Sequence, residues 1–233
     1  MWFQKNKWKI IVPILIVAVL AAAFYFGGNA PGSKGWEVVG NESTDSTAPE
    51  TNPTPTPVPG PTMEINPETG KDKYLTDPIP EGRPKPVEPE DTEVNKGQAY
   101  SCTFSIECST ILNNLAMLDS DKLECVPSGG VILEKTTVTF YEGESVFDVL
   151  QRVCKEKGIH MESSWTPIYN SAYIEGIHNL YEFDCGELSG WMYRVNGWYP
   201  NYGCSRYQLK DGDVVEWRYT CDLGNDVGRT GSW

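Results

Sequence analysis

Apolar and polar residues alternate at the start of the C-terminal half of the chain. From Tyr100 to Cys108, apolar residues occupy the even positions and polar residues the odd ones, which is the period of a strand with one buried face. Residues 131–141 are rich in Val, Ile and Thr, and Glu142-Gly143 provides a turn after them. The pattern predicts two strands, with Cys102 and Cys108 both on the buried face of the first.

A helical pattern follows the second strand. Ser145 and Asp148 have the spacing of a capping box, and Gly158 stands where a helix commonly ends. Between them, apolar residues recur at the helical period and predict one buried face, which comprises Val146, Val149, Leu150, Val153 and Cys154.

Two tight turns organise the rest of the chain, after an aromatic region at 165–183 with few regular signals. Residues 191–195 alternate and lead into Asn196-Gly197, a pair typical of a hairpin turn, with a return strand expected from Trp198. Asp211-Gly212 is a second turn, and the last strand follows it with Val215, Trp217, Tyr219 and Cys221 on one face. The order strand, strand, helix, strand, strand, strand predicts an α+β fold of the β-grasp kind, a mixed sheet with one packed helix.

The first 30 residues have a different character. Residues 10–26 carry no charge, and Lys5, Lys7 and Lys9 precede them. Such a run reaches the lower limit for crossing a bilayer, so we expect a signal anchor over 10–27 with a cytoplasmic tail over 1–9. The alternative is a cleaved signal peptide ending near Ala21-Ala22-Ala23. In both cases the rest of the chain is expected outside the cell, and it is secreted if the segment is cleaved.

A segment rich in Pro, Thr, Glu and Asp separates this run from the alternating pattern. Its most regular part is the stretch at 53–59, in which every second residue is proline. A segment with few apolar residues has nothing to offset the entropy of ordering it. We therefore predict a disordered stalk over 28–96, a folded domain over 97–224 and a tail over 225–233.

Charge and aromatic content indicate what the domain binds. The net charge of -13 excludes a polybasic nucleic-acid binder, which needs clustered Lys and Arg. Aromatic residues are concentrated after Trp165, and Tyr and Trp suit a surface that is apolar but hydrogen-bonds at its edge. A corrin ring, a sugar face or a partner protein would stack on such a surface, although these rings also suit a core. The candidate ligand-binding residues are Trp165, Tyr169, Tyr173, Trp198, Tyr199 and Tyr202.

Seven cysteines in an exported domain predict three disulfide bonds and one remaining thiol. Cys125 lies in a polar connector and is expected to be the unpaired one, and we expect Cys185 to join Cys204 across the base of the Asn196-Gly197 hairpin. The candidates for pairing are Cys102, Cys108, Cys154, Cys185, Cys204 and Cys221. No metal is expected, because the short cysteine spacings of zinc sites are absent.

Catalytic signals are weak. Cys154 and His160 are the only Cys and His close together in sequence, but six helical steps place them about 120° apart around a helix axis, and Gly158 ends the helix between them. No glycine-rich phosphate loop is present. We therefore expect a protein that is not an enzyme and has no cofactor.

Three motifs, at 138–150, 189–197 and 207–217, resemble the transcobalamin-like C-terminal domain family, over about residues 131–221. That family is similar to the small β-rich domain of vitamin B12 carriers, and its bacterial members resemble exported surface proteins. The resemblance implies a membrane-anchored extracellular binding module with a corrinoid or another flat molecule as ligand. The alternative is an adhesion or cell-envelope interaction module that binds a glycan or a surface protein.

Overall fold

The computed structural model describes residues 65–230. The predicted anchor, the stalk before residue 65 and the last three residues of the tail lie outside this range and stay predictions. Within residues 65–230, no helix is both long and apolar enough to span a bilayer.

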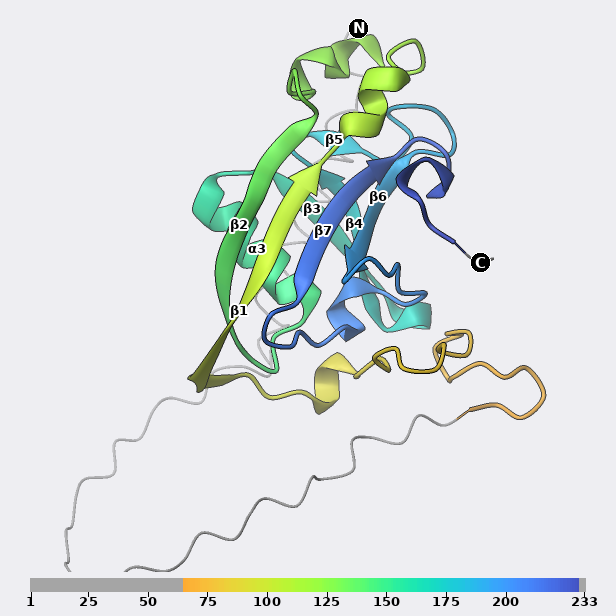
Figure 1. Cartoon of the computed structure of the whole chain (residues 1–233). Helices are drawn as coiled ribbons and strands as arrows, with labels where there is room; N and C mark the ends of the chain where they lie inside the picture. Colours follow the sequence, from red (N-terminus) through yellow and green to blue (C-terminus); the bar gives the residue numbers. More distant parts are fainter. Residues whose placement is uncertain (1–64, 231–233) are drawn as a thin grey trace, which may run out of the picture. The chain divides into compact units, whose positions relative to one another are not determined.

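A four-stranded mixed sheet forms the main layer (Figure 1). Its order is β2 (Val131–Glu142), β1 (Asn95–Glu107), β7 (Val214–Thr220) and β6 (Gly190–Val195). The central β1 and β7 are parallel, whereas β2 and β6 run antiparallel to their neighbours. The predicted α+β class, with strands at these four places, is confirmed.

Within the described residues, the one α-helix is α3 (Val146–Lys157), which packs on one face of this sheet. Ser145 Oγ accepts a hydrogen bond from the Asp148 amide at 3.2 Å, and the Asp148 carboxylate accepts one from the Ser145 amide at 2.8 Å. Gly158 has a φ of 66° and ends the helix. The five apolar residues predicted to share a face are buried, so the predicted helix is confirmed with its boundaries.

A second sheet, which the sequence does not predict, lies on the same side as α3. It consists of β3 (Met161–Thr166), β4 (Ser171–Ile177) and β5 (Leu180–Tyr181), all antiparallel (Figure 1). The expected return strand from Trp198 is wrong, because only one bridge joins Trp198 to Val195 and Pro200, which follows, has no amide for a ladder. Short 3-10 turns connect the elements at Pro89–Asp91, Ser109–Asn113, Ser120–Cys125, Pro167–Tyr169, Cys204–Arg206 and Asn225–Val227.

Residues 65–94, here called the strap, precede β1 and pack against the loop after β6 (Figure 1). They belong to the segment predicted as stalk, yet Asp72 and Thr76 are buried. The Val87 amide donates to the Arg206 carbonyl at 2.9 Å, and Gln208 donates to Thr92 at 2.8 Å. Polar contacts with a distant loop hold the strap, and a rule based on apolar content does not detect them.

The cysteines lie in two separate hydrophobic clusters. Cys204 belongs to the larger cluster around α3, whereas Cys185 belongs to a smaller one. All seven thiols are free in this structure, and the predicted framework of three disulfide bonds stays a prediction. The separate clusters do not favour the expected Cys185–Cys204 pair, because disulfide formation requires the two Cα atoms to lie within about 7 Å of each other.

Candidate functional site

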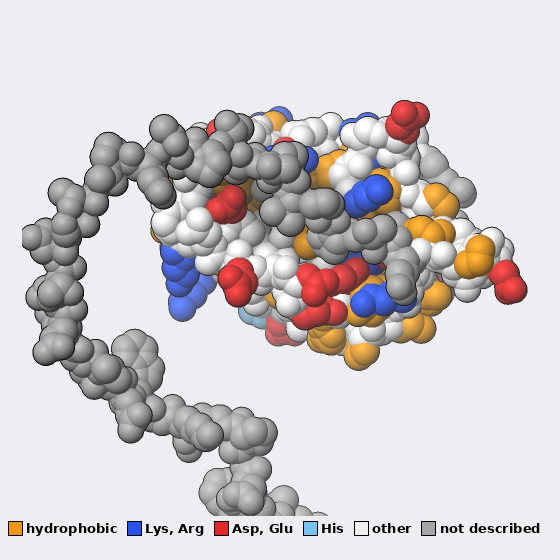
Figure 2. Space-filling view, turned by 90° about the horizontal axis from the view of Figure 1, so that it is seen from below, with side chains coloured by type: hydrophobic (Ala, Val, Ile, Leu, Met, Phe, Trp, Pro, Cys, Tyr) orange, Lys and Arg blue, Asp and Glu red, His pale blue; other side chains and the backbone are white. Residues whose placement is uncertain are grey.

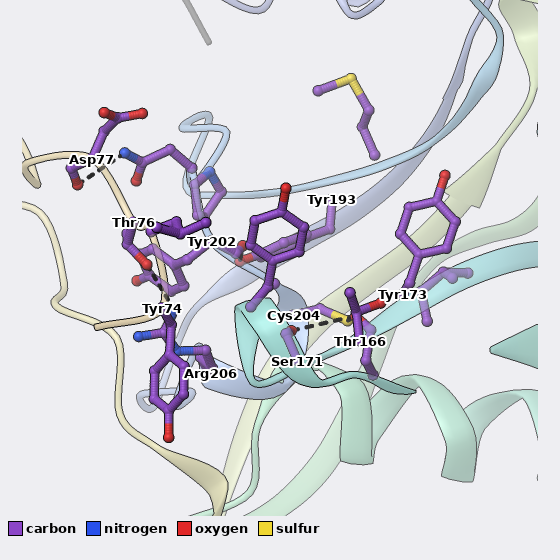
Figure 3. Close-up of a pocket in the computed structure, with 18 of the residues that line it drawn as sticks. Tyr74, Thr76, Asp77, Thr166, Ser171, Tyr173, Tyr193, Tyr202, Cys204 and Arg206 are labelled. Carbon is purple, nitrogen blue, oxygen red and sulfur yellow. Dashed lines mark hydrogen bonds between the residues drawn. The ribbon is translucent and has the colours of Figure 1, made fainter. Parts of the chain in front are cut away.

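A cavity of about 510 Å³ lies between β4, β6, the loop 200–204 and the strap (Figure 3). Its volume is within the range of small-molecule sites. The strap contributes residues 71 and 74–77 to the wall, and β7 contributes Trp217. The other lining residues are Thr166, Tyr169, Ser171, Ala172, Tyr173, Ile174, Trp191, Met192, Tyr193, Pro200, Asn201, Tyr202, Gly203, Cys204 and Arg206.

Aromatic rings make up much of this wall. The Tyr193 and Trp217 ring centroids are 5.6 Å apart. The Tyr193 hydroxyl donates to the Tyr202 carbonyl at 2.7 Å, and the Tyr202 hydroxyl donates to the Pro84 carbonyl at 2.8 Å. These two hydrogen bonds connect β6, the loop and the strap in one chain, so the aromatic wall is held in place before any ligand arrives.

The loop 200–206 approaches the start of β4 closely. A Cβ atom added to Gly203 would stand 1.6 Å from Ser171 Oγ, so only glycine fits there. Ser205 Oγ lies 3.0 Å from Ser171 Oγ and accepts a hydrogen bond from the Ala172 amide at 3.0 Å. This contact fixes the distance between two walls of the cavity.

Arg206 joins the loop to the strap. Its side chain is 1% exposed and lies 2.7 Å from both Asp72 and Glu88. It also donates to Thr76 Oγ1 at 2.7 Å, and its guanidinium lies over the Tyr74 ring (Figure 3). Burial would raise the pKa of Asp72, but hydrogen bonds from Arg206 and from the Thr76 amide outweigh it and lower that pKa below its usual value. The carboxylate is therefore charged at neutral pH.

Three buried polar atoms of lining residues have no hydrogen-bond partner among the residues that the structure describes. They are Trp217 Nε1, Arg206 Nε and Asn201 Oδ1. Buried polar atoms without partners are uncommon, and each costs about 1–3 kcal/mol. All three atoms are inaccessible to solvent, so they lie behind the surface that lines the cavity.

The structure brings three of the six predicted binding residues to the cavity. Tyr169, Tyr173 and Tyr202 line it, the first two at its exposed rim. Trp198 packs behind Tyr202 with ring centroids 6.0 Å apart.

The other two predicted residues lie elsewhere. The Tyr199 side chain is buried, and its hydroxyl donates to the Val227 carbonyl at 2.9 Å. Trp165 is 49% exposed and lies outside the set of lining residues. Three further aromatic residues of the cavity wall were not expected there, because strand alternation marks them as core: Trp191, Tyr193 and Trp217.

The face that carries the strap combines charge with apolar surface. Seen from this side, acidic and basic side chains stand beside hydrophobic ones (Figure 2). Lys71 and Asp77 form an ion pair of 3.1 Å there, with both side chains well exposed. Next to them on the cavity wall is Leu75, which is half exposed. The mouth of the cavity is thus amphipathic.

Cys154 and His160, the Cys and His close together in sequence, have different surroundings. Burial raises the pKa of the Cys154 thiol to about 12, whereas the His160 ring lies 3.1 Å from Glu162 and packs near Tyr181. Within residues 65–230, no group of three or more His, Cys, Asp or Glu side chains is arranged to hold a metal ion.

Residues 143–221 match the model of a family described as a domain of unknown function, DUF4430. This range falls within the segment that resembles the transcobalamin-like family, and it covers less than half of the chain. The comparison with curated proteins gave no match.

Among solved structures, the chain is similar to haptocorrin in a crystal structure of its complex with Cbi. The identity is 19% and the TM-score 0.38, over 56% of this chain and 27% of the haptocorrin chain. It is also similar to a Ruminococcus gnavus ATCC 29149 protein described as a "putative metal binding protein", with 14% identity and a TM-score of 0.29, over 53% of this chain and 96% of that one. The similar region spans about a quarter of haptocorrin, and identities this low carry no binding residue over to this chain.

Proposed function

We propose that the domain is a binding module whose ligand occupies the cavity between β4, β6 and the strap. The observation that carries this proposal is the cavity itself, which combines an aromatic wall with a few convergent polar groups, the usual composition of a small-molecule site.

A flat ligand with polar edges suits this cavity best. Tyr and Trp faces stack on planar rings, and their hydroxyl and indole groups reach polar substituents. Among flat molecules, a corrinoid is the first candidate, because the motifs at 138–150, 189–197 and 207–217 resemble the domain of the vitamin B12 carriers. The strand order β2-β1-β7-β6 with a parallel central pair supports the β-grasp-like assignment that this resemblance implies.

A second candidate function is adhesion to a protein or a glycan. It is favoured by the hairpin between β3 and β4, which exposes a row of large apolar side chains. Trp165 is 49% exposed, Ile168 58% and Tyr169 52%. Adjacent exposed aromatic residues are typical of interaction surfaces.

We also propose that the protein is anchored in the membrane with its domain outside the cell, and that it does not catalyse a reaction. The charge-free run at 10–26 and the lysines before it support a membrane anchor with the domain outside. The buried Cys154 thiol, whose pKa is raised to about 12, supports a structural role for this residue, because the thiolate is the nucleophile. We accordingly propose binding without catalysis.

Titration of the full chain with cobalamin tests the proposal. We expect saturable calorimetric heats and a change in tryptophan fluorescence, since Trp191 and Trp217 line the cavity. Absence of both at high micromolar cobalamin would rule out a corrinoid, and retention on a glycan array or on cell-wall material would then favour adhesion.

A pair of variants on β3 tests the location. Thr166 lines the cavity, whereas Ser164 is exposed on the same strand and does not. Thr166→Trp is expected to fill the mouth and weaken cobalamin binding more than tenfold, about 1.4 kcal/mol. Ser164→Trp is expected to change it less than twofold. Equal binding by both variants would place the ligand elsewhere.

A further inference from the structure

Four cysteines gather in the smaller hydrophobic cluster. Cys108, Cys185 and Cys221 are buried in it, and Cys125 packs against them. Cys185 and Cys221 share this cluster, and each thiol affects the pKa of the other. We propose that these two thiols are joined by a disulfide bond in the mature protein, a pairing that rests on the structure and not on the proposed ligand.

Contacts on both sides of the pair hold the two backbones in register. On one side, the Tyr219 hydroxyl donates to the Tyr181 carbonyl at 2.7 Å and lies 3.0 Å from Ser189 Oγ. On the other side, the Leu223 amide donates to the Leu188 carbonyl at 3.0 Å. A disulfide forms only where the backbones already approach closely. Here, two residues after Cys221 and three residues after Cys185, a backbone hydrogen bond already joins the two segments.

The turn before β6 is also internally fixed. The Cys185 amide donates to Ser189 Oγ at 3.1 Å, and the Cys221 amide donates to the Asp226 carboxylate at 2.8 Å. These two hydrogen bonds fix the backbone at each of the two cysteines. The geometry therefore favours this pairing over one with Cys204, which belongs to the other cluster.

Oxidation of the pair has a simple balance. The two Sγ atoms form one bond, each thiol loses its proton, and two electrons pass to a disulfide oxidant, which is reduced to two thiols. Oxidised glutathione, or the active-site disulfide of a thiol oxidase, is an oxidant of this class. Because burial raises the pKa of Cys221 to about 12, thiolate is scarce in the folded state. The bond accordingly forms while the chain folds.

The bond would tie down one wall of the cavity. Gly190 and Thr220 pair at this end of the β6–β7 ladder, and β6 carries Trp191 and Tyr193 to the cavity. Cys185 precedes β6 and Cys221 follows β7. The disulfide would therefore join the two strands at the end of the ladder opposite the segment 196–213 that connects them. It thereby fixes the aromatic wall of the cavity.

Peptide mapping of the exported full chain tests the pairing. The protein is alkylated under denaturing conditions without reductant, digested and analysed by mass spectrometry. We expect one peptide linking Cys185 to Cys221, and alkylated thiols at Cys102, Cys154 and Cys204. Alkylation of Cys185 and Cys221 in the exported protein, or a bridge from either to another cysteine, would overturn the proposal.

Two variants provide matched controls. Cys185→Ser should leave Cys221 fully alkylated, whereas Cys154→Ser, which removes a buried thiol of the other cluster, should leave the linked peptide intact. Loss of the linked peptide in Cys154→Ser would contradict the proposal. If a variant does not fold, the map of the unmodified chain decides the pairing alone, and it does so whether or not the cavity binds cobalamin.

Discussion

We predict that a single substitution, Asp72→Asn, weakens the attachment of the strap to Arg206. The Asp72 carboxylate accepts from Arg206 at 2.7 Å and from the amides of Thr76 and Tyr74 at 2.8 and 2.9 Å. Asparagine keeps an oxygen for the two amides but turns an NH₂ group toward the guanidinium. Breaking a buried ion pair by removing one partner costs about 3–5 kcal/mol. Glu88 and Thr76 still contact Arg206, so we take the lower figure, about 3 kcal/mol.

Amide hydrogen exchange measures this change locally. A loss of about 3 kcal/mol accelerates exchange roughly a hundredfold, and the Val87 amide, bonded to the Arg206 carbonyl, reports on it from the far part of the strap. Asp77→Asn is the control, since the exposed Lys71–Asp77 pair is worth less than about 1 kcal/mol. A Val87 exchange rate within threefold of the unmodified chain in Asp72→Asn would refute the account of the strap.

The contribution of Asp72 to the stability of the strap depends on pH. The folded pKa of Asp72 lies below its usual value, so its contribution is complete at neutral pH and is lost as pH falls below about 4 toward the folded pKa. Strap protection in the unmodified chain should therefore decrease in acid. Asp72→Asn has no carboxyl at this position, and its protection should lack this component.

Two further predictions concern local geometry. Ser145→Ala removes the oxygen that accepts from the first turn of α3 and should lower the free energy of unfolding by about 1 kcal/mol, seen as a lower urea midpoint at unchanged slope; an unchanged midpoint would contradict the cap. Gly203→Ala places a methyl group 1.6 Å from Ser171 Oγ and should cost about 1–3 kcal/mol. Ser171→Gly should recover part of that loss, and failure of the pair to differ from Gly203→Ala alone would count against the close approach.

Local signals explain which elements the sequence predicts well. Apolar and polar residues alternate strictly over 100–107 of β1. α3 begins at a capping residue, Ser145, and ends at Gly158. The sequence signals for both elements therefore lie close together along the chain. β3 has the sequence Met-Glu-Ser-Ser-Trp-Thr, with little β-branched character, and much of it is exposed. Its strand conformation depends on pairing with β4 across the turn at Asn170, whose φ of 46° no periodicity reveals.

The site was predictable only in part, because its parts are far apart in sequence. The aromatic concentration after Trp165 falls in the part of the chain that contributes most of the cavity wall, and Tyr202 lines the cavity. Arg206 and Asp72, however, are 134 positions apart, and neither residue is unusual in its own neighbourhood. The acidic strap has the composition of a disordered stalk, and only the buried guanidinium, which requires carboxylate partners, reveals why it folds back.

The most direct test of the cavity as the binding site is amide hydrogen exchange of the full chain with and without saturating cobalamin. Ligand in the cavity should slow exchange in the strap residues 74–77, in 191–193 of β6 and in the loop 200–204, and should leave β2, on the other edge of the main sheet, unchanged. Binding that protects the exposed hairpin at 165–169, or another surface, and leaves these three segments unaffected would contradict the proposed site.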